Sequence, residues 1–150
     1  RLRAPYARGR VITAVDTNVI LDVLTADSEH GACSRSALGR ARLEGSLVVC
    51  EVVLAELAAA FADSPEALEP FLADAGLRLV RTPETALVEA GRLWRAYRGR
   101  GGSRSRLLAD FLVAAHAAAV ADRLLTRDRG FVGLAAAGLA VLDPHEPDPS

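Results

Sequence analysis

The feature that most restricts the fold of this chain is a regular alternation of short apolar runs with longer helical patterns. The short runs span residues 11–15, 47–50, 77–80, 124–126 and 139–142. Such runs, often rich in β-branched residues, are typical of buried strands, whereas the segments between them are long enough for helices. This alternation predicts an α/β fold with a central, mostly parallel sheet of about five strands.

Helical patterns fill the segments between the predicted strands. We expect helices directly after Asp16 and over 29–43, 51–62 and 106–121, and two more that start near Ser64 and near Thr82, the latter running to Tyr97. Ser64 followed by Pro65 is a typical helix start, and the Thr82-Pro83 pair repeats it. The glycine- and arginine-rich stretch 99–105 predicts a loop. We expect one domain over 1–143 and a disordered tail over 144–150.

The composition narrows the possible functions. At 150 residues and 51% hydrophobic content, the chain is large enough for one domain with its own core. Its 18 basic and 19 acidic residues nearly cancel, so the net charge does not indicate a nucleic-acid partner. All the basic residues are arginine, and the absence of lysine excludes Schiff-base chemistry and the P-loop of nucleotide hydrolases.

The two cysteines and the hydropathy pattern indicate the cellular compartment that we expect for this protein. Cys33 and Cys50 fall in a predicted helix and a predicted strand, without the spacing of a metal site, so we expect buried, reduced thiols. No uncharged apolar stretch reaches membrane-spanning length, and the start of the chain is not a signal sequence. The expectation is a soluble cytoplasmic protein without a membrane partner.

Asp110 is the acidic residue that is hardest to explain as ordinary surface. Between Leu107 and Ala121 only Asp110 and His116 are not apolar, which predicts a buried helix. A buried carboxylate is costly unless it is paired, hydrogen-bonded or bound to a metal. The partner is either a metal ion or an arginine, Arg104 or Arg106. His116 lies six residues further on, turned away from Asp110, and is expected to be a hydrogen-bonded core histidine.

Three further acids lie where they could join Asp110. Asp16 and Asp128 each follow a predicted strand, at the edge of a parallel sheet where ligands bind. Helix capping is the alternative for both. Glu56 shares a helix face with the small residues Ala59 and Ala60, and an exposed surface glutamate is its alternative.

Four converging carboxylates would need a counter-charge. Magnesium is the natural one, with manganese as a substitute, because the predicted ligands are all oxygen atoms. The lack of nearby cysteine or paired histidine argues against zinc. A hard divalent ion held in this way can activate a water toward a phosphodiester.

An arginine-rich strip leads into the Asp110 helix. Six arginines and no acid occupy residues 92–106, and those nearest the proposed site are predicted RNA contacts: Arg98, Arg100, Arg104 and Arg106. Trp94 or Tyr97 could stack on a base. The alternatives are a solvated surface or a surface for an acidic protein partner.

Four segments, 15–20, 53–57, 108–117 and 125–131, together resemble the PIN-domain family in order and spacing, and more narrowly the VapC toxins. The resemblance covers about residues 12–144. It implies a three-layer α/β/α sandwich and a Mg²⁺-dependent endoribonuclease. It assigns the metal and the catalysis to Asp16, Glu56, Asp110 and Asp128, and a supporting role to Asn18 and Thr126. It also implies a VapB-like antitoxin that covers the site, and a homodimer.

The sequence departs from the family pattern at one point, and three other classes of protein compete with this interpretation. Val132-Gly133 stands where the family often has an aromatic-rich stretch. Haloacid-dehalogenase phosphatases need a second aspartate at the position of Asn18 and a lysine, and receiver domains also need a lysine, so both are excluded. The remaining rival is a non-catalytic PIN-like module that binds RNA or protein.

Overall fold

The computed structural model describes residues 10–103, 106–131 and 139–146. Arg104 and the pair Val132-Gly133 therefore lie outside the described residues. The elements follow one another in the order β1 (Val11–Val15), α1 (Thr17–Leu24), α2 (Gly31–Glu44), β2 (Gly45–Val49), α3 (Glu51–Ala60), the 3-10 turn η1 (Pro65–Ala67), α4 (Leu68–Ala75), β3 (Leu77–Leu79), α5 (Glu84–Gly99), α6 (Leu108–Val120), β4 (Arg123–Leu125) and β5 (Ala140–Leu142).

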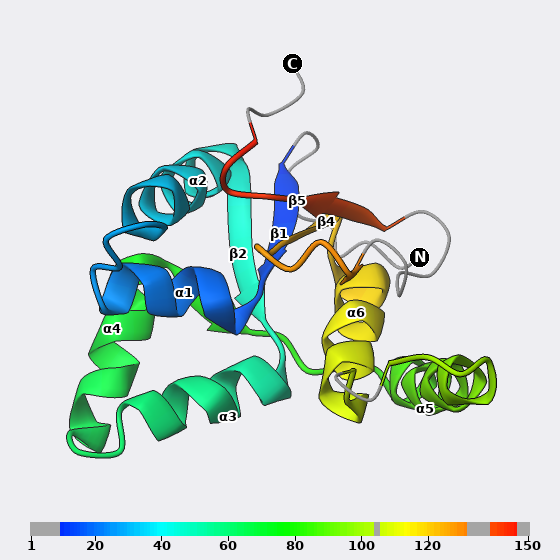
Figure 1. Cartoon of the computed structure of the whole chain (residues 1–150). Helices are drawn as coiled ribbons and strands as arrows, with labels where there is room; N and C mark the ends of the chain where they lie inside the picture. The colour runs from blue at the N-terminus through cyan, green and yellow to red at the C-terminus, as the bar shows by residue number, and fades with distance from the viewer. Residues whose placement is uncertain (1–9, 104–105, 132–138, 147–150) are drawn as a thin grey trace.

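The five strands form one parallel sheet in the order β3-β2-β1-β4-β5. Parallel neighbours require crossover connections, which the helices provide. In Figure 1, α1, α2 and α4 lie to the left of the sheet and α5 and α6 to the right. The predicted α/β/α sandwich with a five-stranded parallel sheet is confirmed.

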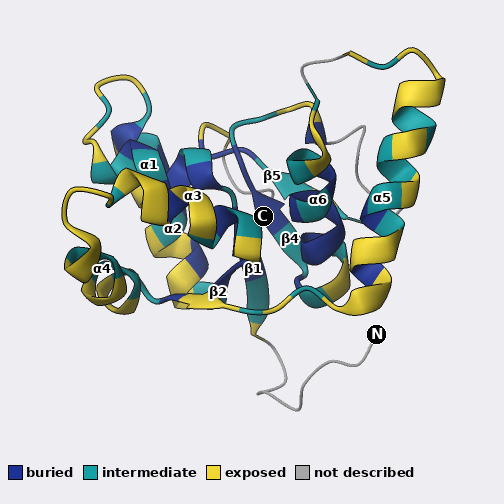
Figure 2. Ribbon diagram, turned by 90° about the horizontal axis from the view of Figure 1, so that it is seen from below, coloured by how far each residue is buried: buried dark blue, intermediate teal, exposed yellow. Residues whose placement is uncertain are grey.

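The core lies on both faces of this sheet. Figure 2 shows buried residues along β1, β2 and β4 and on the inner side of α6, with exposed residues on the outer sides of α4 and α5. Phe111 of α6, Ile20 of α1 and Leu57 of α3 are among the largest fully buried side chains. Each comes from a helix that packs one apolar face inward.

The strand order places a topological switch point beside the end of β1. The chain leaves β1 toward β2 on one side, and β4 pairs with β1 on the other, so the direction of winding reverses there. Ligands of open parallel sheets bind at such a point, outside the carboxyl ends of the strands. Asp16 N–H donates to Leu125 O at 3.0 Å and so continues the ladder past the end of β1. The residues that follow β1 and β4 are thereby held side by side.

Several local predictions need correction. The helix expected from Ser64 is split into η1 and α4, and within the described chain Ser64 makes no side-chain cap bond. Thr82 does not cap α5, because its N–H and its hydroxyl both donate to Glu51, at 2.8 and 2.6 Å. The last helical residue of α5 is Gly99, two residues beyond the predicted end.

Both thiols are free, but their settings differ from the prediction. Cys50 is buried as expected, although it lies at the N-cap of α3 and not in a strand, whereas Cys33 is only half-buried in α2. The start of the predicted disordered tail is ordered. His145 N–H donates to Asp143 at 2.9 Å, and the His145 ring lies edge-on to His30. None of the described helices is long and apolar enough to span a membrane.

Candidate active site

Asp16 stands directly after β1 and is the N-cap of α1. Its Oδ1 accepts a hydrogen bond from Thr17 N–H at 2.8 Å. Its Oδ2 accepts from the hydroxyl of Thr126 at 2.7 Å and from Asn18 Nδ2 at 3.2 Å. The capping role is therefore real. It uses one carboxylate oxygen, and the other faces the end of β4.

Thr126 joins the residues that follow the two strands. This hydroxyl is buried, donates to Asp16, and accepts from Asp128 N–H at 3.0 Å and from Asn18 Nδ2 at 3.3 Å. The Asn18 side-chain oxygen in turn accepts from Arg127 N–H at 3.2 Å. The two residues predicted to support the site thus fix Asp16 and the backbone of Asp128 in one network.

The pKa of Asp16 depends on its burial and on two neighbouring carboxylates. Burial raises the pKa of Asp16, and the negative charges of Glu56 and Asp128 raise it further, against the lowering effect of the Thr126 and Thr17 hydrogen bonds. Glu56 lies on an exposed face of α3, and within the described residues it makes no side-chain hydrogen bond. Glu56 and Asp128 therefore each lie near enough to Asp16 for their charges to disfavour its ionised form.

Asp128 is paired with an arginine from the loop before α6. Arg106 Nη2 donates to Asp128 Oδ1 at 2.6 Å, and Nη1 donates to Oδ2. This pairing is the main reason that the pKa of Asp128 lies below its usual value. The guanidinium also lies over the ring of Phe131, 5.6 Å from its centroid. Gly130 makes this approach possible, because a Cβ atom there would stand 1.5 Å from Arg106 Nη2.

Asp110 is less buried than its sequence context predicts. The helix α6 begins at Leu108, so Asp110 lies in its first turn, half-buried, and accepts from Leu107 N–H at 2.9 Å. The predicted full burial of Asp110 is therefore wrong, and the partner that its carboxylate has in the described residues is the backbone N–H of Leu107 at the helix start. Arg106 pairs with Asp128 rather than with Asp110, although the Asp110 charge is close enough to raise the pKa of Arg106.

The carboxylate oxygens near Asp16 suit a hard cation, but these side chains are not arranged to coordinate one ion together. Within the described ranges, no three His, Cys, Asp or Glu side chains are grouped to hold one ion. The available donors are carboxylate oxygens, which Mg²⁺ prefers. Both oxygens of Asp128 bind Arg106, so the guanidinium supplies the positive charge that a cation would otherwise bring.

The comparisons with known proteins now identify the family. The model of the PIN domain matches residues 13–137 of this sequence. The chain belongs to the PIN-domain family. No curated protein sequence matches this PIN domain.

Solved structures share its fold over nearly their whole length. VapBC-1 from nontypeable Haemophilus influenzae matches with a TM-score of 0.69 and 17% identity, covering 90% of this chain and 99% of that chain. FitAcB from Neisseria gonorrhoeae matches with 0.65 and 22%, covering 89% and 99%. Mycobacterium tuberculosis VapC20, described as a Sarcin-Ricin loop cleaving toxin, matches with 0.59 and 12%, covering 85% and 98%.

The arginine strip of this PIN domain divides between the site and the surface. Arg106 binds Asp128, and Arg98 lies over the indole of Trp94, 5.2 Å from the ring centroid. Arg100 is the exposed C-cap residue of α5. Tyr97 packs on Phe111 with ring centroids 5.4 Å apart, which leaves Trp94 as the better stacking surface.

A second ion pair positions the loop after β4 and was not predicted. Arg127 binds the buried Asp22 of α1 through Nε at 2.7 Å and Nη2 at 3.0 Å. The hydroxyl of Ser34 donates to the same carboxylate at 2.7 Å. Asp22 is the single acid in the apolar segment 19–24, so the signal that pointed to Asp110 was also present here.

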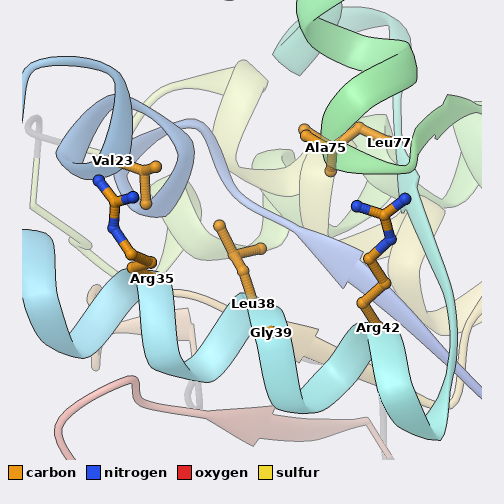
Figure 3. A pocket seen from close by; sticks show the side chains of 7 residues that line it. All are labelled: Val23, Arg35, Leu38, Gly39, Arg42, Ala75 and Leu77. Atoms are coloured by element: carbon orange, nitrogen blue, oxygen red, sulfur yellow. The ribbon is translucent and has the colours of Figure 1, made fainter.

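A hollow of about 300 Å³ lies away from the carboxylates, between α1, α2 and the junction of α4 with β3. Figure 3 shows Arg35 and Arg42 rising from α2 on either side of Leu38. Val23, Ala75 and Leu77 complete an apolar lining. Arg42 is held by a 2.6 Å hydrogen bond from Nη1 to Asp74 O.

His116 lies outside both the carboxylate site and this hollow. It is buried and its ring binds Val80 O, as predicted.

Proposed function

We propose that this PIN domain is a Mg²⁺-dependent endoribonuclease of the VapC type, the toxin of a toxin-antitoxin pair. The observation that carries the proposal is the hydroxyl of Thr126, which binds the carboxylate of Asp16 and the backbone of Asp128 at the carboxyl ends of β1 and β4. Glu56 adds a third carboxylate whose charge acts on Asp16. The fold shared with VapC20, described as a Sarcin-Ricin loop cleaving toxin, supports the reaction class.

The proposed roles follow from these contacts. Asp16, Glu56, Asp110 and Asp128 would hold Mg²⁺, or Mn²⁺ in its place, which lowers the pKa of a bound water and stabilises charge on the phosphate. Thr126 and Asn18 orient Asp16, because their hydrogen bonds leave its side chain few other conformations. Arg106 has to leave Asp128 before both carboxylate oxygens become available.

The proposed protein partner is a VapB-like antitoxin, since structural neighbours are VapBC complexes. The hollow of Figure 3 offers a docking position for it, with an apolar lining and an arginine at each end. An apolar segment flanked by acidic residues has the complementary pattern. We also propose that the toxin forms a homodimer.

The rival function is a non-catalytic PIN-like module that binds RNA or protein. One observation favours it: Arg106 binds both oxygens of Asp128 through its two Nη atoms, so a site that never releases this arginine would not take up a cation. The two functions differ in whether RNA is cut when Mg²⁺ or Mn²⁺ is present.

A cleavage assay decides between them. Purified protein is incubated with total RNA and either Mg²⁺ or Mn²⁺, with and without chelator, beside the variants Asp16→Asn and Asp63→Asn. Asp63 is an exposed acid outside the site, so its variant is the matched control. We expect cleavage that chelation and Asp16→Asn abolish and Asp63→Asn leaves intact. Cleavage that survives both treatments, or no cleavage at all, contradicts the proposal.

A growth assay tests the toxin role separately. Expression in cells that lack an antitoxin should arrest growth, and Asp16→Asn should restore it. Harmless expression of an active nuclease would remove the toxin role and leave the enzyme.

A further inference from the structure

A second hollow, of about 550 Å³, lies between the end of α5 and the start of α6, next to the carboxylates. We propose that it is a subsite for a nucleotide of single-stranded RNA, adjoining the point of cleavage. The proposal rests on the proposed nuclease function and adds the place where the substrate is held. Its lining includes Trp94, Arg98, Arg106 and Leu107.

The charge of this hollow suits a nucleic-acid backbone. Among the residues that the structure describes, two arginines and no acid line it. Arg98 is exposed, and no carboxylate of the described residues pairs with it, so its charge is available to a phosphate. Neighbouring Arg92 is different, because it is paired with Glu89 at 2.6 Å. Free arginines that face a groove are the usual contacts to phosphates.

The hollow also offers a flat surface for a base. The guanidinium of Arg98 lies over the indole of Trp94, and the side chain of Leu107 is exposed beside it. Unpaired bases stack on aromatic rings and on arginine planes, and apolar side chains extend the contact. A base can therefore lie against this pair while its phosphate meets an arginine.

The rim of the hollow is closely packed. Gly102 N–H donates to Tyr97 O at 3.0 Å, and a Cβ at Gly102 would stand 2.4 Å from the Tyr97 ring. Gly101 has φ +73°, in the left-handed region that favours glycine. Tyr97 is itself packed on Phe111 of the core. These contacts restrict the backbone of Gly101 and Gly102, which line the hollow.

Arg106 connects the hollow to the carboxylates. It lines the hollow and binds Asp128, so one side chain separates a nucleotide placed there from the proposed metal ligands. A phosphate in the hollow would compete with Asp128 for this guanidinium. Binding of RNA would then draw Arg106 away from Asp128.

Trp94 makes the proposal directly testable, because it is the single tryptophan of the chain. A short single-stranded RNA is titrated into the intact protein in the presence of chelator, so that no cleavage occurs, and tryptophan fluorescence is recorded. We expect saturable quenching. Arg98→Gln should weaken binding severalfold and lower the slope of log K against log salt by about one. Arg40→Gln, the same charge change at an exposed position of α2, should have no effect.

Each contrary result has a distinct meaning. Absence of quenching, or equal weakening by Arg40→Gln, overturns the subsite. Quenching by poly-glutamate as strong as that by RNA also overturns it, because the surface would then suit an acidic protein. Quenching by RNA without cleavage in Mg²⁺ removes the nuclease and keeps the subsite. Cleavage with unchanged KM in Arg98→Gln, together with no quenching, removes the subsite and keeps the nuclease.

Discussion

In the proposed nuclease, Arg106 and a divalent cation would compete for the same carboxylate oxygens of Asp128. The pair is only partly buried, since the Arg106 side chain is 18% and the Asp128 side chain 34% exposed. Partly exposed ion pairs contribute up to about 1 kcal/mol. The guanidinium would therefore oppose a cation only modestly, which is compatible with the proposed nuclease, where a metal ion has to replace the positive charge of Arg106.

Removal of this competitor should strengthen metal binding. We expect Arg106→Ala to raise the affinity for Mn²⁺ by up to about fivefold, the equivalent of that energy. Gly130→Ala should act in the same direction while retaining the arginine, because the added methyl group occupies the position of Nη2. Calorimetric titration with Mn²⁺ measures both, with Arg40→Ala as the control. An unchanged or lower affinity in both variants would show that Arg106 does not compete with the ion.

His116 gives the protein a pH dependence that is separate from the site. Burial lowers the pKa of this imidazole below its ordinary value of 6.5, against the opposing effect of the Val80 carbonyl. The unfolded chain therefore binds a proton that the folded chain resists. The contribution of neutral His116 to the free energy of unfolding is fully present above about pH 6.5. It is lost as the pH falls toward the lower pKa of this residue in the folded chain.

We expect the urea concentration at the midpoint of unfolding to decrease when the pH is lowered from 7.5 to 5.5. His116→Gln should be less stable at pH 7.5, since it loses the 2.7 Å bond to Val80 O, and should show a weaker pH dependence. Fluorescence of Trp94 follows the unfolding. His30→Gln is the control, because His30 is only half-buried. A pH dependence that persists in His116→Gln but disappears in His30→Gln would contradict this prediction, because His30 and not His116 would then cause it.

At the scale of elements, apolar periodicity located the interiors of strands and helices better than their ends. The strand β1 has the predicted bounds, whereas α6 starts two residues later than predicted. That shift decides the position of Asp110, because it moves this residue from the interior of a helix to its first turn. Helix ends depend on capping bonds such as Leu107 N–H to Asp110, which a hydropathy pattern does not contain.

The candidate site was predictable where it follows from strand ends and was not where it depends on distant side chains. Asp16, Asn18 and Thr126 meet because the sequence places them directly after two strands that pair. The pairing of Arg106 with Asp128 spans 22 residues, and that of Asp22 with Arg127 spans 105. Only the folded chain shows which of its many arginines approaches which acid.

The Asp22–Arg127 pair holds α1 against the loop that carries Asp128. Arg127→Gln leaves the buried Asp22 carboxylate with Ser34 as its remaining side-chain partner, so we expect a loss of about 1–3 kcal/mol in unfolding free energy. Adding Asp22→Asn should recover part of this loss, since it removes the unpaired charge. Urea unfolding measures the unfolding free energies of Arg127→Gln, of Asp22→Asn and of the double variant. A double variant that is less stable than Arg127→Gln by the full cost of Asp22→Asn would show that the two residues do not interact.

At the scale of the whole molecule, the two hollows lie on opposite sides of the sheet. The hollow of Figure 3 belongs to the group of helices α1, α2 and α4, and the proposed nucleotide subsite to α5 and α6. The proposed positions for a protein partner and for RNA are thus separate. A partner docked beside α2 has to extend across the carboxyl edge of the sheet to cover Asp16 and Asp128.

This separation predicts that partner binding can be removed without loss of RNA cleavage. Gly39 lines the Figure 3 hollow, and a Cβ there meets no atom within 4 Å, so Gly39→Phe should fill the hollow and leave the fold intact. Gly91 of α5 has equally open surroundings, which makes Gly91→Phe the matched control. With the product of the neighbouring reading frame coexpressed, cells carrying Gly39→Phe should stop growing while those carrying Gly91→Phe grow. Because cleavage of RNA by purified Gly39→Phe should equal that of the unmodified protein, growth rescue that persists in this variant would show that the partner docks elsewhere.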